Sequence, residues 1–210
     1  MRNRFQANPY IVCLLALLCI QCQPTEKANV YELSAYSANK HIQAVIEIPA
    51  GTNRKIEFNT TSKRFEVDQR DGKDRVIQYL PYPANYGFIP GTFSDPTKGG
   101  DGDALDILIL CKSLPTGTVM EVLPIGMLKL IDDGELDYKI IAIPMDLSLR
   151  TVDATSLKVL QDTYPYIQEI VAQWFLHYDS GNSQEIQGVG NEIEALNEIK
   201  SQLKVNPILP

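Results

Sequence analysis

The stretch Gly99–Asp106 carries three aspartates and three glycines within eight residues. Carboxylates this close repel one another unless a cation lies among them, and oxygen-only ligands suit Mg²⁺, Mn²⁺ or Ca²⁺ better than zinc or copper. In an extended chain Asp101 and Asp103 share a face and Asp106 takes the opposite one. The chain must therefore turn near Ala104 if the three are to converge. A solvated acidic turn between strands explains this stretch equally well.

Several other kinds of site are excluded. An EF-hand calcium loop requires an acidic or amide residue at its fifth position and a glutamate at its twelfth, where this chain has Leu105 and Lys112. The sequence contains no P-loop, no Gly-x-Ser-x-Gly elbow and no His-Glu-x-x-His motif. The two histidines, His41 and His177, are too few for most zinc sites, and we expect His177 to be a surface or interhelix residue.

A second acidic group spans residues 132–139 and begins Asp-Asp-Gly-Glu. Asp137 and Lys139 are two residues apart on an expected strand, so both side chains should face the same space. Together with the first group, it could supply the bridging carboxylates that a two-metal site needs. Lys55 and Glu57 also share one strand face. Alternating charges on a strand can equally be its solvated face.

Length and charge limit the function classes. A chain of 210 residues suits one domain with a hydrophobic core. Its net charge of −7 argues against a nucleic-acid binder. An acidic protein that handles a polyanion must bring metal cations to the site.

The first residues resemble an export signal. Arg2 and Arg4 precede an apolar core over residues 11–20, which is too short to act as a stop-transfer helix. Cys22 at its end resembles the lipid-acceptor cysteine of bacterial lipoproteins, although residues 19–21 match the usual small-residue pattern poorly. We expect residues 1–22 to direct export, with Cys22 lipidated on the periplasmic face of a bacterial membrane. A cleaved soluble signal is the alternative. Cys111, at the end of an apolar run, is expected to be a small buried residue.

The remaining chain predicts strands followed by two principal helices, after a polar tether over residues 23–40. Strand-like runs bounded by turn residues cover residues 43–49, 55–58, 64–67, 75–78, 105–111, 118–131 and 137–143. Residues 80–100 have no regular period and are rich in Pro, Gly and aromatic residues, which is typical of a functional loop. Apolar residues at helical spacing recur over residues 165–178 and 191–204. This order predicts an α+β domain over residues 41–210, built on an antiparallel sheet or small barrel.

Five short motifs occur in the order seen in family I soluble inorganic pyrophosphatases: Glu47-Ile48-Pro49, Lys55-x-Glu57, Pro81-Tyr82-Pro83-Ala84-Asn85-Tyr86-Gly87-Phe88-Ile89-Pro90, Asp101-x-Asp103-x-x-Asp106 and Asp132-Asp133-x-x-x-Asp137-x-Lys139. No single motif is specific, but the combination is. From residue 43 to residue 178 the chain therefore resembles that family. The resemblance implies an OB-like five-stranded antiparallel β-barrel with additional strands and two principal helices. It also implies a homo-oligomer that hydrolyses inorganic diphosphate with several Mg²⁺ ions, Mn²⁺ being possible.

The resemblance also implies a role for each matching residue. Asp103 would be the general base that deprotonates the attacking water. The metal ligands would be Asp101, Asp106, Asp132, Asp137 and Glu47. The substrate-binding residues would be Lys55, Glu57, Arg75, Tyr86, Lys139 and Tyr178.

The chain departs from the family pattern on the phosphate side. Asp179 follows Tyr178 where the family usually has a phosphate-binding lysine, so we expect Asp179 to weaken substrate binding. Two alternatives follow from this thinned site: a phosphohydrolase that prefers short polyphosphate or a nucleotide, and a non-catalytic surface protein that binds cations or phosphate. The intact Asp103 argues against the second, since metal binding alone would not require it.

Overall fold

A ring of five strands forms the centre of the fold in a computed structural model that describes residues 29–179, 181 and 183–204. The order is β1 (Ile42–Ile48), β6 (Asn85–Phe88), β7 (Asp106–Ile109), β10 (Lys139–Pro144) and β8 (Val119–Asp132), which pairs again with β1. This arrangement agrees with the expected five-stranded barrel. One expectation needs correction, because β7 and β10 run parallel, whereas the other pairs of the ring are antiparallel.

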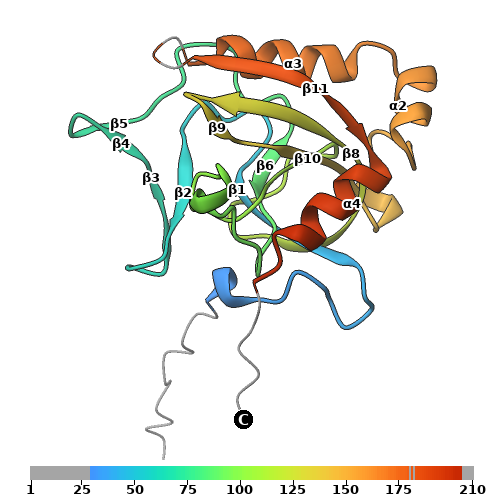
Figure 1. The fold of residues 1–210 in the computed structure, drawn as a ribbon, viewed down its shortest axis with the longest axis horizontal. Coiled ribbons are helices and arrows are strands. Elements are labelled where there is room, and N and C mark those ends of the chain that lie inside the picture. Colours follow the sequence, from blue (N-terminus) through green and yellow to red (C-terminus); the bar gives the residue numbers. More distant parts are fainter. Residues whose placement is uncertain (1–28, 180, 182, 205–210) are drawn as a thin grey trace, which may run out of the picture.

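Additional strands extend and flank this ring. β11 (Gln184–Asn191) and β9 (Glu135–Leu136) pair with β8. Two hairpins, β2 (Ile56–Asn59) with β3 (Arg64–Val67) and β4 (Gln69–Arg70) with β5 (Lys73–Asp74), project at the left of Figure 1. The expected strand over residues 75–78 was wrong, since Val76 makes only an isolated bridge with Arg54. The expected loop over residues 80–100 was wrong in part, because it contains β6 and the 3₁₀ turn η2 (Pro96–Lys98).

Three α-helices follow the barrel strands, with a 3₁₀ turn η3 (Leu147–Leu149) before them. The two expected helices are α3 (Ile167–His177) and α4 (Glu192–Ser201). Asn191 caps α4 and forms a capping box with Glu194. The sequence reasoning missed α2 (Leu157–Thr163), and β11 lies between α3 and α4. The order is therefore not simply strands and then helices.

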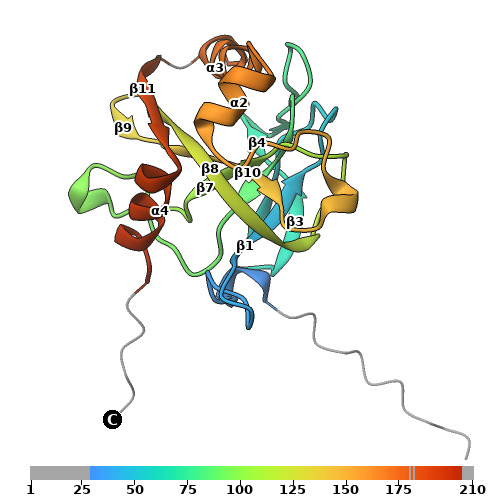
Figure 2. The same ribbon diagram turned by 90° about the vertical axis from the view of Figure 1, so that its right-hand side faces the viewer.

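The barrel strands are buried on both faces, which explains their continuous apolar runs. On β7, Ile107 and Ile109 belong to a core cluster that includes residues of α4, whereas Leu108 belongs to a second cluster with residues of α2 and α3. Figure 2 shows α2 and α3 together at the top of the molecule and α4 at its lower left. Helices on two sides therefore cover the barrel and leave its remaining side for the hairpins.

Residues 29–40, which we expected to belong to a tether, lie against the domain instead. The 3₁₀ turn η1 (Val30–Glu32) brings the Tyr31 ring within 5.3 Å of the Phe88 ring. Ala35 is buried, and its carbonyl accepts a hydrogen bond from Gln43. These aromatic and backbone contacts hold the segment on the domain. The expected export signal and Cys22 lie outside the described residues.

No helix within the described residues is long and apolar enough to cross a membrane.

Two smaller expectations concern single residues. Cys111 is half-buried rather than buried, and the Asn85 side-chain amide donates a hydrogen bond to its sulfur. His177 is exposed at the end of α3, where its ring contacts the Gln173 carbonyl, as expected for a surface residue.

Candidate active site

One cleft of about 340 Å³ gathers every candidate catalytic, metal-ligating and substrate-binding residue that the sequence indicated. These side chains come from the barrel strands, from the turns before β7 and β10, from β2 and the residue before it, from the residue after β5 and from the residue after α3. They are Glu47, Lys55, Glu57, Arg75, Tyr86, Asp101, Asp103, Asp106, Asp132, Asp137, Lys139 and Tyr178. The structure therefore brings together residues that are up to 131 positions apart, from Glu47 to Tyr178.

The parallel pair β7–β10 explains how the two acidic groups meet. Its register places Lys139, the first residue of β10, opposite Asp106, the first residue of β7. The Lys139 ammonium contacts the carboxylates of both Asp106 and Asp137. It also lies 3.1 Å from the Tyr86 hydroxyl, which itself donates a hydrogen bond to Asp106. The expected common face of Asp137 and Lys139 is confirmed.

Charge and burial oppose each other in this cluster. Burial alone lowers the pKa of Lys139, but the Asp106 and Asp137 carboxylates raise it above its ordinary value. Burial, which outweighs the attraction of Lys139, raises the pKa of Asp106 to about 6. Buried carboxylates of this kind require a cation nearby, and here the Lys139 ammonium supplies one.

Within the described part of the chain, no three His, Cys, Asp or Glu side chains already surround a common point as metal ligands. The Lys139 ammonium contacts two of the expected ligands, Asp106 and Asp137. The ligand set itself fits a hard divalent cation, since every expected ligand is a carboxylate. Asp132, at the end of β8, accepts a hydrogen bond from the Gln184 amide at 3.3 Å.

Asp103 lies in the turn before β7, exposed at the cleft. Gly102, with a φ of 90°, makes this turn, and the Asp103 backbone N–H donates to the Asp101 carboxylate at 3.0 Å. The chain thus turns as the spacing required, though at Gly102. Partial removal of water by the surrounding protein is the largest cause that raises the pKa of Asp103, and the negative charge of Asp101 is the next. A raised pKa makes a carboxylate a better proton acceptor.

Glu47 is the most deeply placed of the other acidic residues, with an exposed fraction of 8%. It accepts a hydrogen bond from the Phe58 backbone N–H at 2.7 Å. Burial, outweighing that bond, raises its pKa to about 8, and the charges of Asp106 and Glu57 raise it further. Glu47 therefore holds a proton near neutral pH unless a cation lies beside it.

Tyr178 also lines the cleft and directly follows the helix α3. Its ring stacks on Trp174 with centroids 4.6 Å apart. Burial is the largest cause that raises its pKa to about 12. The Tyr178 hydroxyl therefore stays protonated and can donate a hydrogen bond to a phosphate oxygen.

Ion pairs hold two basic residues of the cleft, Lys55 and Arg75. Lys55 contacts Glu57 at 2.5 Å, and Arg75 contacts Asp68 at 3.1 Å and Asp179 at 2.5 Å. The sequence led us to expect Asp179 to face the substrate as an uncompensated negative charge. The structure places its carboxylate against arginines.

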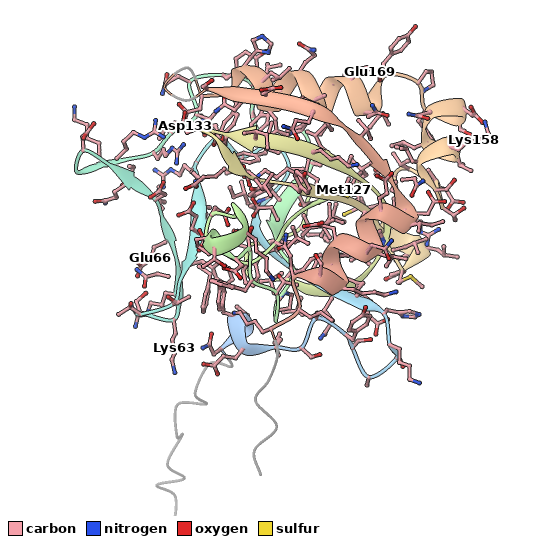
Figure 3. All side chains as sticks on the ribbon, viewed as in Figure 1. Lys63, Glu66, Met127, Asp133, Lys158 and Glu169 are labelled. Carbon is pink, nitrogen blue, oxygen red and sulfur yellow. The ribbon has the colours of Figure 1, made fainter. Side chains whose placement is uncertain are left out.

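The sequence reasoning missed several residues that line the cleft. Figure 3 labels one of them, Asp133, at the turn between β8 and β9. Tyr31 reaches the cleft from η1, in the supposed tether. The adjacent Val30 and Tyr31 were an apolar signal in a polar segment. The full set is Tyr31, Phe58, Tyr82, Phe88, Ala104, Asp133, Glu135 and Phe175.

Comparison with known proteins gives consistent results. A family model described as Pyrophosphatase, inorganic pyrophosphatase, matches residues 44–205. The inorganic pyrophosphatase of Sulfolobus acidocaldarius is 34% identical over 168 residues, which cover 78% of this chain and 90% of that protein. That of Neisseria meningitidis serogroup B is 33% identical over 167 residues, covering 78% and 87%.

Solved structures are similar as well. The crystal structure of inorganic pyrophosphatase from Thermus thermophilus has a TM-score of 0.71 and 25% sequence identity, and the match covers 84% of this chain and 97% of that one. An inorganic pyrophosphatase from Neisseria gonorrhoeae has a TM-score of 0.66 and 31% identity, covering 78% of this chain and 90% of that one.

Proposed function

This chain belongs to the inorganic pyrophosphatase family, and from that premise we propose that it hydrolyses inorganic diphosphate to two orthophosphates. One observation carries the proposal: a single cleft is lined by the expected base Asp103 and the acidic cluster and also by Arg75 and Tyr178. Phosphoryl transfer is catalysed chiefly by positioning and by charge neutralisation, and this cleft offers both.

Members of this family depend on metal ions, and we propose Mg²⁺ for this chain, with Mn²⁺ as a possible substitute. The residues that would hold the ions are carboxylates, and burial raises the pKa values of two of them, Glu47 and Asp106, with a further contribution from neighbouring carboxylates. When bound, divalent cations neutralise charge on diphosphate and lower the pKa of a coordinated water. The proposed ligands are Asp101, Asp106, Asp132, Asp137 and Glu47.

The side chains of the cleft supply the remaining steps. Asp103 accepts a proton from the attacking water, whose oxygen forms the new P–O bond while the bridging P–O bond breaks. The leaving phosphate takes the electron pair of that bond. Arg75 and Tyr178 donate hydrogen bonds to phosphate oxygens, and Lys55, which lines the same cleft, adds a further positive charge. A general base of this kind contributes roughly 10²–10⁴ in rate.

The test is phosphate release from diphosphate by the purified full chain, with Mg²⁺ and then with excess EDTA. We expect rapid release with Mg²⁺ and none with EDTA. No release under either condition, together with retained cation binding, would instead support a non-catalytic binding protein.

A second candidate is a phosphoanhydride hydrolase for short polyphosphate or a nucleotide. An adjoining cavity of about 310 Å³ favours it, because Arg75 and Tyr178 line both cavities and Arg70 and Lys73 line the second. A longer substrate would have to extend past Arg75 into that cavity. A kcat/KM for tripolyphosphate or ATP above that for diphosphate would establish this candidate over the first.

We also propose that the protein is exported and lipid-anchored through Cys22, which the order of charged, apolar and cysteine residues in the first 22 positions supports. Cys22→Ser should then move the protein from the membrane pellet to the soluble fraction. Fractionation with immunoblotting measures this, and a pelleted mutant would contradict the anchor. A homo-oligomer, implied by the family resemblance, stays a prediction.

A further inference from the structure

Six side chains of alternating charge form a series that leads from the cleft to the adjoining cavity. Lys55 precedes β2, Glu57 lies on β2, Asp68 lies between β3 and β4, Arg70 lies on β4, Arg75 follows β5 and Asp179 lies after α3. Successive contacts measure 2.5, 4.0, 3.1, 2.5 and 2.9 Å along the series Glu57, Lys55, Asp68, Arg75, Asp179 and Arg70. The series ends at Arg70, which lines the adjoining cavity and not the cleft.

Arg75 is the member of this series that is held from two sides. Its Nη1 donates to Asp68 at 3.1 Å and its Nη2 donates to Asp179 at 2.5 Å. Its side chain is 14% exposed, although it lines the cleft. A guanidinium has five N–H donors, so these two bonds orient the group and leave donors for a ligand. Arg75 is therefore oriented without being fully used.

Asp179 is fixed in turn. Arg70 binds it with two bonds, from Nη1 at 3.2 Å and from Nη2 at 2.9 Å, and the Gly181 backbone N–H donates to the same carboxylate at 3.1 Å. Partial burial alone would raise the pKa of Asp179, but the bonds from Arg70, Gly181 and Arg75 lower it to about 2. Its side chain is only 10% exposed. Two arginines thus offset its charge, and the three groups together carry one net positive charge.

We propose that Asp179 is a positioning residue: it holds the Arg75 guanidinium toward the cleft for a phosphate group, while Arg70 fixes Asp179 and offsets its charge. This inference rests on the proposed function for the identity of the anion. It reverses the expectation from the sequence that Asp179 weakens substrate binding. It also assigns a role to Arg70, which the sequence did not single out.

The substitution Asp179→Asn separates positioning from simple charge repulsion, because the two predict opposite results. Asparagine removes a negative charge near a polyanion, so repulsion alone predicts a lower KM. The substitution also weakens the charge-assisted bond from Arg75 and so frees the long Arg75 side chain. Positioning therefore predicts that the KM for Mg-diphosphate rises about three- to thirtyfold, with kcat changed less. Asp179→Glu, which keeps the carboxylate, should lie nearer the parent protein.

Three further variants complete the kinetic test. Arg70→Ala should also raise KM, because Asp179 loses its anchor and its negative charge is no longer offset by Arg70. In an Arg75→Ala background, Asp179→Asn should have little further effect, since Asp179 acts through Arg75. The matched control is Asp153→Asn, which breaks a 2.6 Å pair with Arg150 outside both cavities and should leave KM unchanged.

Calorimetric titration with methylenediphosphonate, a diphosphate analogue with no hydrolysable bridge, gives a readout independent of turnover. Asp179→Asn should weaken its binding by a similar factor. A KM or dissociation constant that falls or stays constant in Asp179→Asn would overturn the proposal, as would an equal effect in the Arg75→Ala background. If the parent protein releases no phosphate but Asp179→Asn still weakens analogue binding, the proposed reaction fails and the positioning role stands.

Discussion

The two sides of the cleft are built in different ways. On the acidic side, Asp106 and Lys139 each begin a barrel strand, and the backbone register of β7 with β10 places one opposite the other. On the basic side, Arg75 and Asp179 follow the short strand β5 and the helix α3, and only side-chain ion pairs join them. Backbone ladders resist local change, whereas partly exposed ion pairs contribute little stability and are weakened by salt.

This difference indicates how each side can change. The acidic cluster is anchored on strands buried on both faces, so a substitution there alters chemistry within a fixed frame. The basic side can exchange one cationic arrangement for another without disturbing the barrel. At position 179, where the family resemblance led us to expect a lysine, Arg70 and Arg75 supply the positive charge beside the aspartate.

The largest expected effect is on the acidic side. Asp103→Asn should lower kcat by at least about a hundredfold, because it removes the general base, and should leave KM and metal binding nearly unchanged. Steady-state kinetics at saturating Mg²⁺ measures this. An unchanged kcat would exclude Asp103 as the base and would leave the acidic side with a role in binding only.

Next in size is Asp106→Asn, which should raise the Mg²⁺ concentration for half-maximal activity by at least about tenfold. It removes the charge of a proposed ligand and one of the two carboxylates that contact Lys139. Asp133→Asn is the matched control, since Asp133 lines the same cleft without a proposed metal role. Equal shifts in both variants would show a general charge effect instead of ligation.

Glu47→Gln should increase the stability of the metal-free protein at high pH. Because the folded-state pKa of Glu47 is raised to about 8, its contribution is favourable at low pH and is lost as pH rises through that value. In EDTA at pH 9, Glu47→Gln should be more stable than the parent chain by about 1–3 kcal/mol, with a smaller difference at pH 5. Thermal unfolding at both pH values measures this, and a less stable variant at pH 9 would contradict it.

The smallest effect is expected for Tyr178→Phe on the basic side. The ring can still stack on Trp174, so unfolding temperature should not change, while loss of the hydroxyl should raise KM by roughly threefold to tenfold. Kinetics and thermal unfolding of the same preparation test both points. A hundredfold fall in kcat would remove the distinction between the two sides, because Tyr178 would then take part in the chemical step.

The sequence by itself determined the acidic side almost completely. The spacing of Asp101, Asp103 and Asp106 required a turn, and the parity of Asp137 and Lys139 required a common face, because both follow from local backbone geometry. Apolar periodicity also located α3 and α4 and most of the barrel strands. The helix α2 escaped, since seven residues make too few turns for a clear period, and β11 escaped because its sequence is mostly polar residues and glycine.

Only the tertiary structure decided the basic side. Arg70 and Asp179 are 109 positions apart, and no local pattern predicts that their side chains meet. Residues 29–40 likewise belonged to an expected polar tether, yet Tyr31 packs on Phe88 and lines the cleft. In both cases the interaction energy comes from contacts that exist only after the barrel has brought distant segments together. The expectation for Asp179 rested on its charge alone, whereas its effect depends on which cations surround it, and the structure shows two arginines there.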